Sequence, residues 1–252
     1  MIFWKSLEEE EEFFAINPDI RYEAVQLNNG TTAIIIDDFY KNPEGVREFI
    51  LNTQGTHFRS VKGNLVGERL DMKCAVYRYH SVVREMGQYI STYDFKTPVA
   101  KLKANKTWSH DRPHKPHIDG KSHTYPQCVA SVLYLNTEEE CDGGTAFFTY
   151  QGDPTLTVNN SSDWSNEDYE SFSKNEKGDW KQIDTLEMKF NRLVVYRGDK
   201  FHSSIITPTN FLKYPRIVQV SFMKEEVVDN SRDARHAGRN LIRFSPPTVQ
   251  GT

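Results

Sequence analysis

Short apolar runs, separated by turn-forming residues, dominate the chain between residues 98 and 223. Runs of this length and spacing are typical of antiparallel strands and not of alternating strand–helix–strand units. We therefore expect two packed sheets of the jelly-roll type in this part of the chain. The expected strands are Val99–Leu102, Cys128–Leu135, Thr145–Tyr150, Leu186–Phe190, Leu193–Tyr196 and Arg216–Met223.

Residues 1–97 carry a different pattern, which predicts helices and a strand that support the β core. An alanine and three isoleucines between turn signals predict a strand over Thr32–Asp37. Asn42 can cap a helix that has a proline in its first position, and this helix is expected to end near Gly55. Apolar residues at helical spacing predict a second helix after Ser81, with its aromatic residues in the core.

The domain organisation is expected to be simple, because no internal repeat and no Pro- or Gly-rich linker divides the chain. We expect one domain over residues 1–252, with a β core over 98–223 and a tail over 224–252. An insert at 151–182 interrupts the β pattern and carries several aromatic residues. Two interpretations stay open: a lid over a site, or a satellite hairpin or helix packed on the sandwich.

Charge and composition disfavour several classes of function. The 252 residues are 37% hydrophobic and carry a formal net charge of −4 (31 − 35), so no overall basic field attracts nucleic acid or anionic lipid. A local basic tail with Arg232, Arg235, Arg239 and Arg243 is more typical of a solvated surface. No apolar run reaches the ~18 residues of a membrane span. The glutamates at 8–12 are unlike a secretory signal.

The cysteine pattern favours free thiols in a reducing cytoplasm. Cys74, Cys128 and Cys141 are odd in number, widely spaced and without a CxxC pair. Such a set gives neither a disulfide framework nor a zinc–thiolate site. We therefore expect buried free thiols and a cytoplasmic location.

One segment carries metal-binding chemistry. His117 and Asp119 are two residues apart, so on an extended chain both side chains point to the same side. A third candidate, His202, follows the apolar strand expected at Leu193–Tyr196. Two histidines and one carboxylate can occupy one face of an octahedron around Fe(II) and leave the opposite face open. Zinc accepts the same ligands, so the ligand types alone do not fix the metal.

Four segments in order now carry a resemblance to a known family. They are KPHID at 115–119, SVLYLN at 131–136, GGTAFF at 143–148, and RLVVYRGDKFHSSI at 192–205 followed by RIVQVSF at 216–222. In these segments the chain resembles the Fe(II)/2-oxoglutarate-dependent oxygenases, in particular the prolyl-hydroxylase-like branch and its small bacterial and viral members. The resemblance implies a double-stranded β-helix with N-terminal helices packed on one sheet.

The resemblance also implies a role for each matching residue. His117, Asp119 and His202 would bind Fe(II), and Arg216 would hold the distal carboxylate of 2-oxoglutarate in a bidentate pair. Tyr134 would donate its hydroxyl to the same carboxylate. The alternatives are a surface ion pair for Arg216 and a plain core aromatic for Tyr134.

The implied activity is a dioxygenase reaction with Fe(II), 2-oxoglutarate and O₂. It would hydroxylate an amino-acid, peptide or other small-molecule substrate and release succinate and CO₂. One departure from the family pattern is Thr107-Trp108, where many relatives carry a cosubstrate-side tyrosine. Extra histidines crowd the HxD segment, at His110, His114 and His123. Each could line the pocket or tune the site, although a surface position is the simpler interpretation.

Two other functions compete with an oxygenase. The first is a jelly-roll protein that keeps the metal without turnover. The second is a structural or assembly protein in which the HxD pair is a coincidence. Fold alone cannot choose among these, because jelly rolls host many functions. The pattern gives no indication of the oligomeric state.

Overall fold

The computed structural model describes residues 6–59, 66–72, 76–91, 94–98, 102–109, 116–119, 128–150, 180–206 and 209–226. Its helices are α1 (Leu7–Phe13), α2 (Pro43–Asn52), α3 (Val76–Ile90) and the 3₁₀ turn η1 (Glu138–Glu140). Its strands are β1 (Tyr22–Gln26), β2 (Thr32–Ile36), β3 (Thr56–Arg59), β4 (Val66–Asp71), β5 (Asp94–Pro98), β6 (Lys103–Thr107), β7 (Cys128–Tyr134), β8 (Gly144–Tyr150), β9 (Trp180–Glu187), β10 (Leu193–Arg197), β11 (His202–Ser204) and β12 (Arg216–Glu226).

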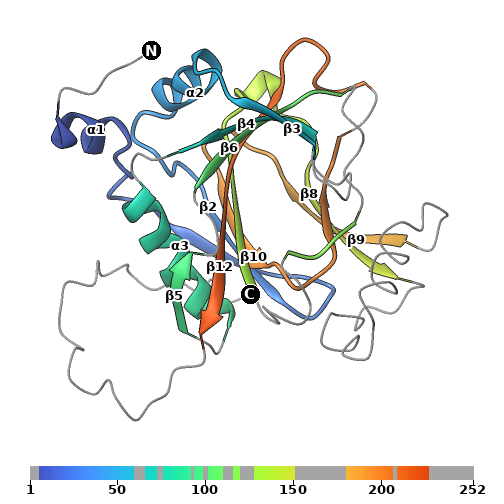
Figure 1. Ribbon diagram of the computed structural model, residues 1–252. Helices are drawn as coiled ribbons and strands as arrows, with labels where there is room; N and C mark the ends of the chain where they lie inside the picture. Colours follow the sequence, from blue (N-terminus) through green and yellow to red (C-terminus); the bar gives the residue numbers. More distant parts are fainter. Residues whose placement is uncertain are drawn as a thin grey trace, which may run out of the picture.

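The strands form a large sheet and a small sheet, as predicted for a mainly β protein (Figure 1). The large sheet has nine strands in the order β1-β2-β10-β7-β12-β6-β4-β3, with β5 paired to β12. The small sheet has three strands in the order β11-β8-β9. Every strand pair that the structure describes is antiparallel. The first 97 residues contribute more than support, because β1 to β4 belong to the large sheet itself.

The two faces of the large sheet build two separate cores. In β7, Val129 and Leu133 join the core that includes residues of α2 and α3, while Val132 and Tyr134 join the core that faces the small sheet. Side chains alternate between the two faces of a strand, so a strand covered on both sides must be apolar at successive positions. This explains why the central strands read as continuous hydrophobic runs. Figure 1 shows the helices on one side of the large sheet, with β8 and β9 on the other.

The helix predicted after Asn42 is confirmed as α2. The side chain of Asn42 accepts a hydrogen bond from the Gly45 N–H at 3.2 Å, and Pro43 occupies the first turn. An asparagine cap and an early proline both favour a helix start at this position. Val46 and Ile50, one turn apart, are fully buried in the core beside the large sheet.

The second predicted helix begins earlier than expected. α3 starts at Val76 and not after Ser81, because its first turns are anchored by the fully buried Tyr79, whose hydroxyl lies 3.3 Å from that of Ser131. Tyr89, expected in the core, is 56% exposed. It packs against Tyr22, with ring centroids 5.3 Å apart.

Four of the six predicted strands of the β core correspond closely to β7, β8, β10 and β12. The other two were misplaced. The run Val99–Leu102 falls between β5 and β6, with residues 99–101 outside the described residues, and the actual strand is the polar Lys103–Thr107. The run Leu186–Phe190 covers only the end of β9. The polar β6 was missed because two of its buried residues, Asn105 and Thr107, line a cavity and a third, Lys106, pairs with Glu68, so a hydrophobic pattern cannot reveal it.

Parts of three other expectations lie outside the described residues. Most of the insert, 151–179, is among them, and its last three residues, 180–182, begin β9. The tail is described only as far as Glu226, within β12. Of the cysteines expected as buried free thiols, Cys74 lies outside the described residues, while Cys141 is a free thiol, as expected, but is half-buried. No helix in the described ranges has the length and apolar character that a membrane crossing requires.

An ion pair joins the end of β2 to the turn before β10. The Arg192 guanidinium donates to both carboxylate oxygens of Asp37, at 2.6 Å and 3.0 Å, and Lys189 adds a contact at 2.9 Å. The hydrogen bond from Arg192 holds the pKa of the Asp37 carboxyl below its ordinary value, against the opposing effect of burial. This ion pair therefore links the residue that follows β2 to the residue that precedes β10, beside the point where Ile36 and Leu193 pair.

We predict that Asp37→Asn lowers the free energy of unfolding by about 1 kcal/mol at pH 7. Because the pKa is lower in the folded state, the stabilisation is complete above the ordinary aspartate pKa of about 3.9 and is lost as the pH falls through the folded value. Urea unfolding at pH 7 and at points down to pH 3 measures this. The control is Glu11→Gln, at the exposed Arg78–Glu11 pair, and it should change stability much less. A pH-independent effect of Asp37→Asn would contradict the prediction.

Candidate metal centre

His117 and His202 are brought together by the backbone. Each donates its N–H to the carbonyl of the other, both at 2.9 Å, in an isolated antiparallel bridge. The Asp119 N–H donates to the Gly198 carbonyl at 2.8 Å, which fixes the HxD segment at a second point. The two imidazole rings therefore lie with their centroids 4.6 Å apart. The three predicted ligands meet although His202 is far from the other two along the chain.

The ligand atoms of His117, Asp119 and His202 all lie within 4.8 Å of one another. The Nε2 atom of His202 is 3.2 Å from Oδ2 of Asp119, and Nε2 of His117 is 3.9 Å from Oδ1. Oδ2 is buried and receives no aligned hydrogen bond from the residues that the structure describes. A buried carboxylate oxygen beside two imidazole nitrogens fits a divalent metal ion, because such an oxygen is costly to leave without a partner. The donor set of two nitrogens and one carboxylate fits Fe(II) and equally Zn(II).

The ring orientation of His202 also suits a metal ligand. Its Nδ1 lies 2.8 Å from the carbonyl oxygen of Lys200. A carbonyl can only accept, so Nδ1 carries the proton and Nε2 is left to face the centre. Burial lowers the pKa of His202, but the Asp119 carboxylate and the Lys200 carbonyl outweigh burial and place that pKa above its ordinary value. The Asp119 carboxylate and the Lys200 carbonyl, which favour the protonated imidazole, would also favour a metal cation bound to His202.

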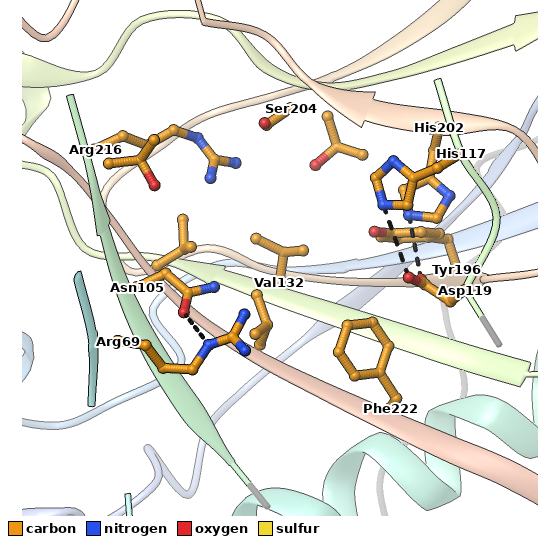
Figure 2. A pocket seen from close by; sticks show the side chains of 14 residues that line it. Arg69, Asn105, His117, Asp119, Val132, Tyr196, His202, Ser204, Arg216 and Phe222 are labelled. Carbon is orange, nitrogen blue, oxygen red and sulfur yellow. Dashed lines mark hydrogen bonds and ion pairs between the residues drawn. The ribbon is translucent and has the colours of Figure 1, made fainter. Parts of the chain in front are cut away.

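The three ligands open onto a cavity between the two sheets (Figure 2). His117, Asp119 and His202 lie on one side, and Arg216 points into the cavity from the other. The cavity has a volume of about 80 Å³, which is room for several water molecules. Between these three residues and Arg216, the cavity is lined by the hydroxyls of Thr145 and Ser204 and by the apolar side chains Val132, Val218, Val220 and Phe222.

Arg216, at the first position of β12, is a buried cation. The side chain is 4% exposed, and its Nε has no hydrogen-bond acceptor among the described residues. Burial lowers the pKa of its guanidinium below the ordinary value. A buried guanidinium is stabilised by an anion, and its planar fork matches a carboxylate. The alternative interpretation as a surface ion pair is therefore wrong.

Tyr134 lies behind the cavity wall. Its ring centroid is 5.5 Å from the guanidinium carbon of Arg216, and its hydroxyl lies 2.7 Å from Oγ1 of Thr145. Burial raises the pKa of the phenol, although the nearby Arg216 partly opposes this. Thr145 is the residue of this pair that lines the cavity. A direct contact between Tyr134 and a carboxylate stays a prediction.

Asn136, the last residue of the SVLYLN segment, fixes the start of β12, a role that sequence reasoning missed. Its Oδ1 accepts from the Ile217 N–H at 2.7 Å, and its Nδ2 donates to the Pro215 carbonyl at 2.9 Å. These two backbone groups flank Arg216, and Asn136 is fully buried. The asparagine therefore positions the guanidinium through its backbone. A polar residue at the end of the apolar run 128–135 was the available signal.

The cavity wall includes other residues that the sequence did not single out. They are Arg69, Asn105, Thr145, Tyr196 and Ser204. Thr107 belongs to the pair noted as a departure from the family pattern, and it does line the cavity, while Trp108 does not. Tyr196 packs edge-on against His202, with centroids 4.9 Å apart. His110, His114 and His123 lie outside the described residues.

Two of three comparisons with known proteins find proteins that are similar to this chain. A search of curated proteins gives no match. Among solved structures, the chain is similar to the non-heme alpha ketoglutarate dependent epimerase SnoN from nogalamycin biosynthesis, at 12% identity and a TM-score of 0.46, over 82% of this chain and 84% of that one. It is also similar to a Pseudomonas putida prolyl-4-hydroxylase, at 11% identity and a TM-score of 0.41, over 73% and 83% of the two chains.

A prolyl 4-hydroxylase from Phytophthora capsici gives 16% identity and a TM-score of 0.41, over 89% of this chain and 67% of that one. Since all these TM-scores are below 0.5, the function proposed below rests on the residues of this chain. A sequence family model, described as a family of unknown function, DUF6445, matches residues 18–216. That match covers well over half of the chain, so the protein belongs to the DUF6445 family.

Proposed function

We propose that this protein is an Fe(II)- and 2-oxoglutarate-dependent dioxygenase that hydroxylates an amino-acid, peptide or other small-molecule substrate. The observation that carries the proposal is the pairing of two features in one cavity: the His117–Asp119–His202 group and, across from it, the buried Arg216. A metal on the first and a guanidinium on the second suit the two ends of a small dicarboxylate. We further propose that the two sheets form a double-stranded β-helix within a single domain.

Each residue of the triad has a simple task in this proposal. His117 and His202 would each give an imidazole nitrogen, and Asp119 one carboxylate oxygen, so that three positions of an octahedron stay open. Bound there, Fe(II) would supply the chemistry that couples decarboxylation of 2-oxoglutarate to hydroxylation of the substrate, with O₂ consumed and succinate and CO₂ released. One carboxylate and two neutral imidazoles leave a net positive charge with Fe(II), which favours a dianionic cosubstrate.

Arg216 would bind the distal carboxylate of 2-oxoglutarate. Its burial makes this pairing strong, because a charge-assisted hydrogen bond is weakened less where water is excluded. The hydroxyl of Thr145, held by Tyr134, faces the same cavity from the small sheet and can donate to the bound acid. The valines and Phe222 of the large sheet are apolar, so they exclude water from the space between arginine and metal.

Metal and cosubstrate binding give a direct test of this proposal. Metal-free protein titrated without oxygen with Fe(II) and then 2-oxoglutarate should develop a weak visible charge-transfer band. His202→Ala should abolish the band, because one of three ligands is lost. Arg216→Gln should keep the band but raise the required 2-oxoglutarate concentration about 10- to 100-fold, since a hydrogen-bonded ion pair is lost.

Other outcomes of this titration would contradict the proposal in distinct ways. Iron binding without a band would favour a metal-binding protein that performs no turnover. Absence of iron binding would mean that the HxD pair is a structural coincidence. A band that survives in His202→Ala would show that the metal is held elsewhere.

A further test concerns the positioning role of Asn136. Asn136→Ala should lower the free energy of unfolding by about 2–4 kcal/mol, because two buried backbone groups lose their partners. It should also weaken 2-oxoglutarate binding severalfold, because Arg216 begins the strand that Asn136 fixes. Chemical unfolding and the 2-oxoglutarate titration measure the two effects.

Asn191→Ala is the matched control for this prediction. The Asn191 side chain accepts from the Tyr40 N–H and donates to the Tyr40 carbonyl, both at 2.9 Å, and it does not line the cavity. The control should lose at least as much stability, because Asn191 also has a left-handed φ of 60° that disfavours alanine. Its 2-oxoglutarate affinity should stay close to that of the wild type. Equal weakening of 2-oxoglutarate binding in both variants would mean that Asn136 has no specific effect on Arg216.

A further inference from the structure

A second guanidinium, that of Arg69, lines the same cavity as Arg216. Arg69 lies on β4, far along the chain from the metal ligands and outside every segment of the family resemblance. Figure 2 shows its side chain pointing into the cavity from a different strand, below Arg216 and across from the triad. One arginine is sufficient for the distal carboxylate of 2-oxoglutarate, so the second guanidinium in the same cavity is suited to another anion.

The strand register fixes where Arg69 points. Arg69 pairs with Asn105 on β6, Asn105 pairs with Val218 on β12, and Val218 pairs with Tyr134 on β7. Directly paired residues of neighbouring strands share a face of the sheet. Arg69 therefore stands in one row with residues of the cavity wall. Its direction is set by the large sheet and not by a loop.

Asn105 orients the guanidinium and adds a donor of its own. The Nε of Arg69 donates to Oδ1 of Asn105 at 3.1 Å, and Asn105 is 6% exposed. Arginine has no acceptor, so the amide oxygen must face Arg69 and the amide Nδ2 is turned away from it. In Figure 2 this nitrogen points toward the middle of the cavity. Because asparagine is neutral, it orients the arginine without cancelling its charge.

The charges of the cavity wall favour a second anion. Among the described lining residues are two guanidiniums and one carboxylate, Asp119, and that carboxylate faces the metal position. Burial lowers the pKa of the Arg69 guanidinium below its ordinary value, although the Asp71 carboxylate, two residues along β4, partly opposes this. A partly buried cation gains from an anionic ligand that replaces lost hydration.

We propose that Arg69 and the Nδ2 of Asn105 bind a carboxylate of the substrate, so that this oxygenase acts on a carboxylate-bearing small molecule, such as an amino acid or a peptide with a free acid group. The inference rests on the proposed function and narrows its substrate class. Arg216 holds the cosubstrate, and Arg69 holds the substrate on a neighbouring part of the same wall. The substrate carboxylate then determines which of its carbons lies next to the metal.

The test uses the full-length protein loaded with Mn(II), which does not turn over, and saturated with 2-oxoglutarate. The probes are N-acetyl amino acids and their uncharged amides, one matched pair for each side chain. Paramagnetic relaxation of the probe protons reports binding close to the metal, with Zn(II)-loaded protein as the diamagnetic control. At least one acid should bind about 10- to 100-fold more tightly than its amide.

Three variants test which residues cause the preference for acids over amides. Arg69→Gln should reduce the ratio of acid to amide affinity to about 1 and leave 2-oxoglutarate affinity within about 3-fold of wild type. Asn105→Asp keeps the acceptor for Arg69 but adds a negative charge, so it should weaken the acids and spare the amides. Arg216→Gln is the matched control and should weaken 2-oxoglutarate instead.

Several results would overturn the inference. They are the absence of any acid preferred over its amide near the metal, a preference that survives in Arg69→Gln, and a loss of 2-oxoglutarate affinity in Arg69→Gln equal to that in Arg216→Gln. Failure of the proposed function is recognised separately, because wild-type protein would then not bind 2-oxoglutarate with the metal. In that case the acid and amide pairs are titrated without 2-oxoglutarate into Arg216→Gln protein, in which Arg216 cannot bind them. A preference for acids should still be present there, and it should be lost when Arg69→Gln is added.

Discussion

Two backbone hydrogen bonds between His117 and His202 hold the candidate site together. They join the segment that carries Asp119 to the short strand β11, whose partner β8 belongs to the small sheet. Because both hydrogen bonds join main-chain atoms, the two imidazoles are held near each other before any metal binds. Thr145 and Ser204 face the cavity from the small sheet, whereas Arg69, Asn105 and Arg216 face it from the large sheet. The distance between the sheets therefore determines what fits between metal and arginine.

The large sheet serves two different purposes on its two faces. The face toward α2 and α3 carries the larger apolar core, with a few buried polar side chains such as Ser131 and Gln219, and supplies stability. The face toward the small sheet changes along β12 from Phe222 and the valines to Arg216, and across β6 and β4 to Asn105 and Arg69. Buried cations are costly in a closed core, but they are suited to a wall that receives anions. The polar strand β6 lies where the apolar part of this face gives way to its polar part.

The sequence predicts the site better than it predicts the surroundings of the site. His117, Asp119 and His202 could be found because the HxD spacing and a histidine after an apolar strand are local signals. The strands β7, β8, β10 and β12 could be found because both of their faces are buried. Arg69 and Asn105 could not, since their role depends on the pairing of β4 with β6, and neither strand has a hydrophobic pattern. Asn136 was hidden similarly, because its partners Pro215 and Ile217 are distant in the chain.

A crystal structure of the protein with Mn(II) and 2-oxoglutarate, grown without oxygen, tests the central claim most directly. We expect anomalous density for one Mn(II) bonded to a nitrogen of His117, a nitrogen of His202 and an oxygen of Asp119. We also expect the distal carboxylate of 2-oxoglutarate to pair with the guanidinium of Arg216. A metal bound by other residues, or a 2-oxoglutarate carboxylate that pairs with Arg69 while Arg216 contacts no ligand, would contradict it.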